Sequence, residues 1–140
     1  MLSPDSSFPL RPEPATIALI GIGCRYAGGA VDSDSTWKAL LEGTDPVRTV
    51  PANRWDVDAW YDPDPSAPGK TITRQGAFLK DIDAFDANRF GISPREATQL
   101  DPQQRLLLEV AWQALEDAAL APDQLAGKRV GLYVGMGMTD

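Results

Sequence analysis

The sequence predicts an α/β domain. Two short apolar runs, at 17–22 and 129–134, are rich in β-branched residues, and segments at 34–42 and 102–119 repeat apolar residues at helical spacing. Continuous apolar runs of this length are typical of strands covered on both faces by helices. An α/β domain normally has several strands at its centre, so two strands indicate an incomplete sheet.

Composition limits the classes of function. The chain has 140 residues, of which 43% are hydrophobic, enough for one domain with a packed core. It has 13 Lys and Arg against 20 Asp and Glu, a net charge of −7 that disfavours nucleic acid as a partner. One Cys and no His exclude an internal disulfide and a Cys/His zinc site. The absence of His also removes the residue that most often transfers protons near neutral pH.

The chain is expected to begin with an extended leader. Residues 1–15 contain four prolines, which prevent a regular hydrogen-bonded structure, and the domain is expected to span 16–140. No apolar stretch approaches the ~20 residues of a membrane span, and the start lacks the features of a signal peptide. A cytoplasmic, reducing environment without membrane contact is therefore expected.

The first helix is expected at 34–42. Ser33 is the predicted N-cap, Asp34 places a negative charge in the first turn, and Gly43 is a natural end. One apolar stripe combines Trp37, Leu40 and Leu41.

Residues 44–70 are expected to form a long irregular surface excursion. Five prolines interrupt this stretch, and three aromatic residues are expected to anchor it to the domain: Trp55, Trp60 and Tyr61. Long loops of this kind frequently belong to functional sites or interfaces.

Two helix starts share one pattern. Ser93, Pro94 and Glu96 predict a capped helix of barely two turns, and residues 101–104 repeat the arrangement eight positions later. The second start opens the long helix that is expected to reach about residue 119. Its predicted buried face combines Leu107, Val110, Ala111, Ala114, Leu115 and Ala118.

The glycine-rich turn after the first run gives only a weak functional signal. Gly21 and Gly23 match the start of a dinucleotide-binding fingerprint, but Tyr26 occupies the third glycine position and the next helix begins too late. Nucleotide binding is therefore a weak alternative. Cys24 follows the predicted strand and has no His as a base, so we expect a small apolar core residue rather than a nucleophile.

The charged residues define no catalytic pair. The dense carboxylates of residues 56–86 fit a solvated acidic face. The one locally basic stretch contains Lys70, Arg74 and Lys80, which form either a contact for an acidic partner or scattered surface cations.

Several segments, in order along the chain, resemble the ketosynthase domain of modular polyketide synthases. The matching segments are 17–26, 51–58, 61–64, 76–79, 85–86, 90–97, 101–117 and 130–135, of which the run DPQQRLLLE at 101–109 is the most specific. Ala77, Asn88 and Arg89 depart from the family pattern. The resemblance covers residues 16–140, about a third of such a domain.

The resemblance implies a thiolase-like fold with α-β-α-β-α layers, usually as a homodimer. It also implies decarboxylative Claisen condensation, in which a cysteine carries the acyl thioester and two histidines assist. The malonyl-type extender arrives on the phosphopantetheine arm of an acyl carrier protein. None of the three catalytic residues has a counterpart in this chain, and no metal or directly bound cofactor is implied. Met136 and Met138 resemble the acyl-pocket segment, with Met138 as an apolar wall, although core methionines would look the same.

The first hypothesis is therefore the N-terminal portion of a ketosynthase, either a fragment or one piece of a split protein, that is catalytically silent by itself. The alternative is a non-catalytic interaction module that pairs with a complete ketosynthase. An incomplete sheet is expected to expose unpaired edges and apolar faces, which would favour aggregation of the isolated chain.

Overall fold

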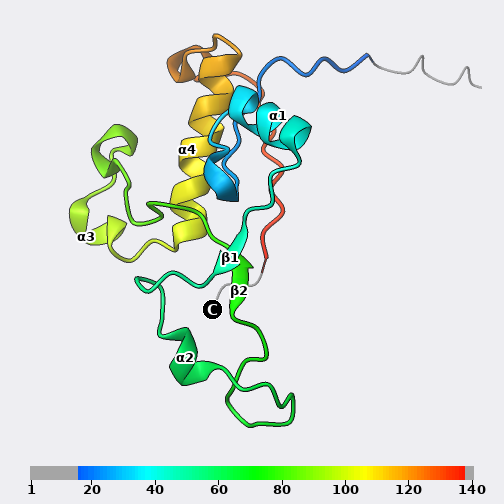
Figure 1. The fold of residues 1–140 in the computed structure, drawn as a ribbon. Helices are drawn as coiled ribbons and strands as arrows, with labels where there is room; N and C mark the ends of the chain where they lie inside the picture. The colour runs from blue at the N-terminus through cyan, green and yellow to red at the C-terminus, as the bar shows by residue number, and fades with distance from the viewer. Residues whose placement is uncertain (1–15, 138–140) are drawn as a thin grey trace, which may run out of the picture.

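The computed structural model describes residues 16–137, and the predicted leader lies outside them. Short elements connected by long loops surround one long helix (Figure 1). In order they are η1 (Ala27–Gly29), α1 (Ser33–Glu42), β1 (Val47–Thr49), α2 (Val57–Trp60), β2 (Gln75–Ala77), η2 (Ala87–Phe90), α3 (Pro94–Ala97), α4 (Pro102–Asp117) and η3 (Pro122–Leu125).

Helix α4 is the element on which the site is built. The Asp101 side chain accepts a hydrogen bond from the Gln103 backbone N–H, with Oδ1 2.7 Å from N, and Pro102 is the first helical residue. The predicted start is therefore confirmed. The helix ends at Asp117, slightly before the predicted position, and the Ala118 N–H bonds back to the Ala114 carbonyl.

The two predicted strands are not formed in this chain. Residues 17–22 and 129–134 are neither helix nor strand, because neither run has a partner strand among residues 16–137. The sheet found in this range is the short antiparallel pair β1–β2, with Arg48 opposite Gly76. Large side chains of both runs are consequently exposed, among them Leu19 at 81% and Tyr133 at 96%. The expected exposure of apolar faces is confirmed.

Helix α1 begins one residue before the predicted position. Asp32, not Ser33, is the N-cap, since its carboxylate accepts from the Ser35 N–H while Ser35 Oγ accepts from the Asp32 N–H. This reciprocal pair satisfies two backbone donors at once, which Ser33 does not offer. Gly43 ends the helix with a φ of 63°, as predicted. The apolar stripe of α1 is exposed: Trp37, Leu40 and Leu41.

Helix α3 is a single turn rather than two. Ser93 caps it as predicted, because its Oγ accepts from the Glu96 N–H. The chain must become extended again at Asp101, which precedes Pro102 and caps α4, so little room remains for a longer helix.

The core is small. The buried apolar residues of the described chain are Cys24, Ala30, Val50 and Val57. Cys24 is thus the buried small residue that the sequence predicts. The predicted buried face of α4 is only half-buried, and its Ala111 is exposed, because no second layer within residues 16–137 covers it.

The excursion at 44–70 is largely irregular, as predicted. Its predicted anchors Trp55 and Trp60 are 45% and 55% exposed, but Trp55 packs edge-on against Phe78, and Tyr61 lies against the guanidinium of Arg74. Backbone hydrogen bonds from Asp62 N to Thr71 O and from Thr71 N to Trp60 O also hold the excursion. Within the described range, no helix has the length and apolar character needed to cross a membrane.

Candidate functional site

Two glycines place the segment 21–25 directly on α4. A Cβ at Gly21 would lie 2.3 Å from the Ala114 carbonyl oxygen, and one at Gly23 would lie 2.2 Å from the Val110 carbonyl oxygen. No side chain fits in that space. The glycines that suggest a nucleotide loop therefore serve close packing of backbone on helix, and this contact delivers Arg25 to the middle of α4.

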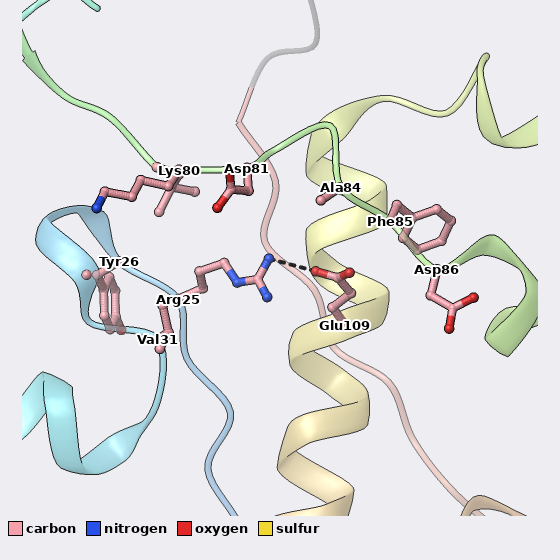
Figure 2. A pocket seen from close by; sticks show the side chains of 11 residues that line it. Arg25, Tyr26, Val31, Lys80, Asp81, Ala84, Phe85, Asp86 and Glu109 are labelled. Atoms are coloured by element: carbon pink, nitrogen blue, oxygen red, sulfur yellow. Dashed lines mark hydrogen bonds and ion pairs between the residues drawn. The ribbon is translucent and has the colours of Figure 1, made fainter.

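Arg25 forms an ion pair with Glu109 (Figure 2). Arg25 Nη1 lies 2.7 Å from Glu109 Oε2, and both side chains are only about one-fifth exposed, at 22% and 20%. The Nε atom of Arg25 is buried without a hydrogen-bond partner among the described residues, as is Oε1 of Gln113. Partial burial makes this pair a stronger contact than an ordinary surface ion pair.

The ion pair lines an open cavity of about 380 Å³. One wall is the turn that carries Tyr26 and Val31, and the opposite wall is the loop 79–86, which presents Lys80 and Asp81 across from Arg25 (Figure 2). Its lining combines charges of both signs with aromatic rings. No group of His, Cys, Asp and Glu within residues 16–137 could hold a metal ion.

A second cavity, of about 250 Å³, surrounds Met136. Arg25 lines this cavity too, together with residues 134–137. Leu106, Leu107 and Val110 of α4 supply the apolar wall. The structure thus places Met136, which is 48% exposed, beside an apolar helix face. Met138 lies outside the described residues.

The three residues of the basic stretch have separate surroundings. The Lys70 Nζ donates to the Ala59 carbonyl, 2.7 Å away. Arg74 pairs with Asp58 and lies over the ring of Tyr61. Lys80 instead lines the cavity around Arg25. The interpretation as dispersed surface cations therefore describes them better than a basic patch.

Many of the carboxylates serve local turns. Asp56 and Asp86 cap α2 and η2. The pKa of Asp64 is lowered mainly by a hydrogen bond from the Ser66 side chain, with a smaller effect of the Ser66 backbone N–H. The side chain and backbone of Ser35 lower the pKa of Asp32 in the same way. A lowered pKa keeps a carboxylate ionised, which is the reverse of what a general acid needs.

Cys24 lacks the surroundings of a nucleophile. Its Sγ lies 3.2 Å from the Thr36 hydroxyl oxygen, it is buried, and the chain has no His to act as its base. Sequence reasoning missed the Arg25–Glu109 pair. Two signals in the sequence were available. Glu109 is a single acidic residue within the apolar run of α4, and Arg25 is a single basic residue just after an apolar segment.

Comparison with known proteins identifies the family. The family model of the β-ketoacyl synthase N-terminal domain matches residues 15–140. The chain belongs to the β-ketoacyl synthase family, and its fold is the N-terminal part of the thiolase-like ketosynthase fold.

Its relatives are polyketide synthases. The chain is 52% identical, over 89% of its length, to a phenolphthiocerol/phthiocerol polyketide synthase protein of Mycobacterium tuberculosis, and covers 7% of that protein. It is 48% identical, over 98% of its length, to the spectinabilin polyketide synthase system protein NorC of Streptomyces orinoci, and covers 6% of it. The chain therefore spans only a small part of these relatives.

Solved ketosynthases share the fold. The oxazolomycin ketosynthase domain OzmH KS7 of Streptomyces albus JA3453 is 40% identical with a TM-score of 0.71, over 78% of this chain and 19% of that one. The ketosynthase from module 6 of the bacillaene synthase of Bacillus subtilis 168 is 34% identical with a TM-score of 0.67, over 77% of this chain and 18% of that one.

Proposed function

We propose that this chain is the N-terminal portion of a modular polyketide synthase ketosynthase, which by itself does not perform the condensation. The observation that carries the proposal is the family match over residues 15–140 in a chain without His, whose single Cys is buried. The complete domain would join an acyl thioester to a malonyl-type extender by decarboxylative Claisen condensation.

The chain's own contribution is to shape the site rather than to react. Met136 lies beside Leu106 and Val110, and this apolar surface suits contact with an acyl chain. Met138 is proposed to continue the same wall. The partners are the remainder of the synthase and an acyl carrier protein, whose phosphopantetheine arm carries the substrate, and the complete domain is proposed to be a homodimer.

An acyl-loading experiment tests the proposal. The purified chain is incubated with an acyl-pantetheine thioester, and its intact mass is measured. We expect no stable acyl adduct, whereas the OzmH KS7 ketosynthase domain, as the positive control, is expected to acquire one. Stable acylation of this chain that disappears in the Cys24→Ala variant would contradict the proposal.

The exposed apolar faces favour one second candidate, a non-catalytic module that docks on a complete ketosynthase. The coding DNA downstream distinguishes the two. A continuous reading frame with the cysteine and two histidine motifs supports the ketosynthase portion, and a genuine stop codon with sustained expression supports the module.

A further inference from the structure

Arg25 stands between two cavities. It lines the cavity of about 380 Å³ beside Lys80 and Asp81, and it also lines the cavity of about 250 Å³ around Met136. Among the described residues, Arg25 is the one that the two linings have in common. Its side chain therefore forms the wall that separates the Met136 cavity from the larger one.

Both ends of Arg25 are fixed against α4. Two residues before it, Gly23 lies so close to the helix that an added Cβ would be 2.2 Å from the Val110 carbonyl oxygen. At the other end, the guanidinium extends from its loop to Glu109, with Nη1 2.7 Å from Oε2 (Figure 2). An arginine packs its methylene stem along apolar surface when its charged end is satisfied elsewhere. The wall is thus held in one position, and its charge is directed at α4.

Helix α4 places this wall beside the apolar surface. Glu109 follows Leu106 by three residues, so the two are neighbours on one face of the helix. Leu106 lines the Met136 cavity, whereas Glu109 lines the larger one. The boundary between the two cavities therefore crosses a single turn of α4, at the point where Arg25 meets the helix.

We propose that Arg25 is a specificity-determining residue of the acyl pocket: it closes the Met136 cavity on the side of Lys80 and so limits the length of the acyl chain that the pocket accepts. Glu109 acts through Arg25 and is a positioning residue. The inference rests on the proposed function for the role of Met136. Without the Arg25 side chain the two cavities would join, and a longer acyl chain would gain room.

Methionine methyl signals test the wall in this chain by itself. The chain has three methionines, so labelling with ¹³C-methyl methionine gives three signals, and the Met136→Leu variant assigns the relevant one. Glu109→Gln releases the guanidinium, and we expect the Met136 methyl signal, recorded without denaturant, to shift or broaden. Glu42→Gln removes the acid of an exposed ion pair and is expected to leave that signal unchanged. An unchanged signal in Glu109→Gln, or an equal change in Glu42→Gln, would overturn the proposal.

Acyl-chain preference tests the consequence in the complete ketosynthase that contains this chain. Acylation of its cysteine is measured with acyl-pantetheine thioesters of increasing chain length, and kcat/KM for a long chain is divided by kcat/KM for a short one. Arg25→Ala is expected to raise this ratio about tenfold, the effect of roughly one methylene group in an apolar pocket. Arg25→Lys keeps a stem and the attraction to Glu109, so its ratio is expected to stay near that of wild type.

Asp32→Ala controls for a change of stability alone, because it removes the N-cap of α1 and is expected to leave the ratio unchanged. An unchanged ratio in Arg25→Ala, or an equal change in Asp32→Ala, would overturn this inference while the proposed function stands. If the wild-type ketosynthase itself acquired no acyl group, the proposed function would fail, and this inference with it.

Discussion

Arg25 and Glu109 connect the loop that follows the first apolar run to the middle of α4. They are separated by 84 positions in the sequence, and a distance of 2.7 Å separates Nη1 from Oε2. Both side chains line the wall of the same cavity, and Arg25 also reaches the cavity around Met136. This ion pair is therefore the contact that fixes the candidate site to the longest helix.

Glu109→Gln should destabilise the chain. The change leaves the largely buried guanidinium of Arg25 without a charged acceptor, and loss of a charge-assisted hydrogen bond of this kind costs about 1–3 kcal/mol. We expect the urea midpoint for loss of the helical circular dichroism signal to decrease.

The exposed Lys38–Glu42 pair provides the control for that prediction. Its atoms are 3.9 Å apart and its side chains are 74% and 58% exposed, so solvent screens the attraction. Glu42→Gln is expected to leave the midpoint nearly unchanged. Equal shifts for the Glu109 and Glu42 variants would show that burial of the Arg25 pair contributes nothing.

Gly23→Ala should displace the segment 21–25 from α4. The new Cβ would lie 2.2 Å from the Val110 carbonyl oxygen, far inside any real Cβ contact, so the segment 21–25 has to shift away from α4. Overpacking of this kind costs about 1–3 kcal/mol, measurable as a lower urea midpoint. Gly135→Ala is the matched control, because nothing lies within 4 Å of its added Cβ, and a wild-type midpoint is expected.

Sequence reasoning located the helices well because their signals are local. The Asp101–Pro102 start of α4, the Ser93 cap of α3 and the Gly43 end of α1 depend on neighbouring residues alone. The N-cap of α1 is Asp32 rather than the predicted Ser33, and this difference is also local. It depends on the reciprocal hydrogen bonds between Asp32 and Ser35, which the N-cap preferences of single residues do not include.

The strands and the site were less predictable because they depend on distant residues. An apolar run such as 17–22 becomes a strand only when another strand pairs with it, and residues 16–137 supply none. The Arg25–Glu109 pair likewise requires the two glycines to seat the loop on α4 before the charges meet. The sequence pattern contains the two charged residues, but it does not show that the glycines bring them together on α4.

The stability of α1 should depend on pH through Asp32. Ser35 lowers the pKa of this carboxyl from its ordinary value of 3.8, so the charged form is favoured in the folded state. Its contribution is therefore complete above the ordinary value and is lost as pH falls through the lowered folded value. We expect part of the helical signal to disappear below about pH 3.8, and to do so less steeply in Asp32→Asn, which still caps but does not titrate. Identical acid profiles for the two proteins would contradict this assignment.

Arg89 should attach η2 to α4 less strongly than Arg25 attaches the segment 21–25 to the same helix. Its guanidinium pairs with Glu116, at 2.5 Å, and lies 4.3 Å from the centre of the Trp112 ring, while Trp112 Nε1 donates to the same carboxylate. Arg89 and Glu116 are 44% and 56% exposed, which places their coupling at about 0.2–1 kcal/mol.

A double-mutant cycle measures that coupling from the urea midpoints of Arg89→Ala, Glu116→Gln and the combined variant. Arg89→Lys separates charge from stacking, because an ammonium keeps the attraction to Glu116 but not the planar contact with the Trp112 ring. If the ring contact contributes, the urea midpoint of Arg89→Lys will lie between those of wild type and Arg89→Ala. Tryptophan fluorescence will also change as η2 loosens. A coupling energy above the destabilisation caused by Glu109→Gln would reverse the order expected from burial, and would make η2, rather than the segment 21–25, the main attachment to α4.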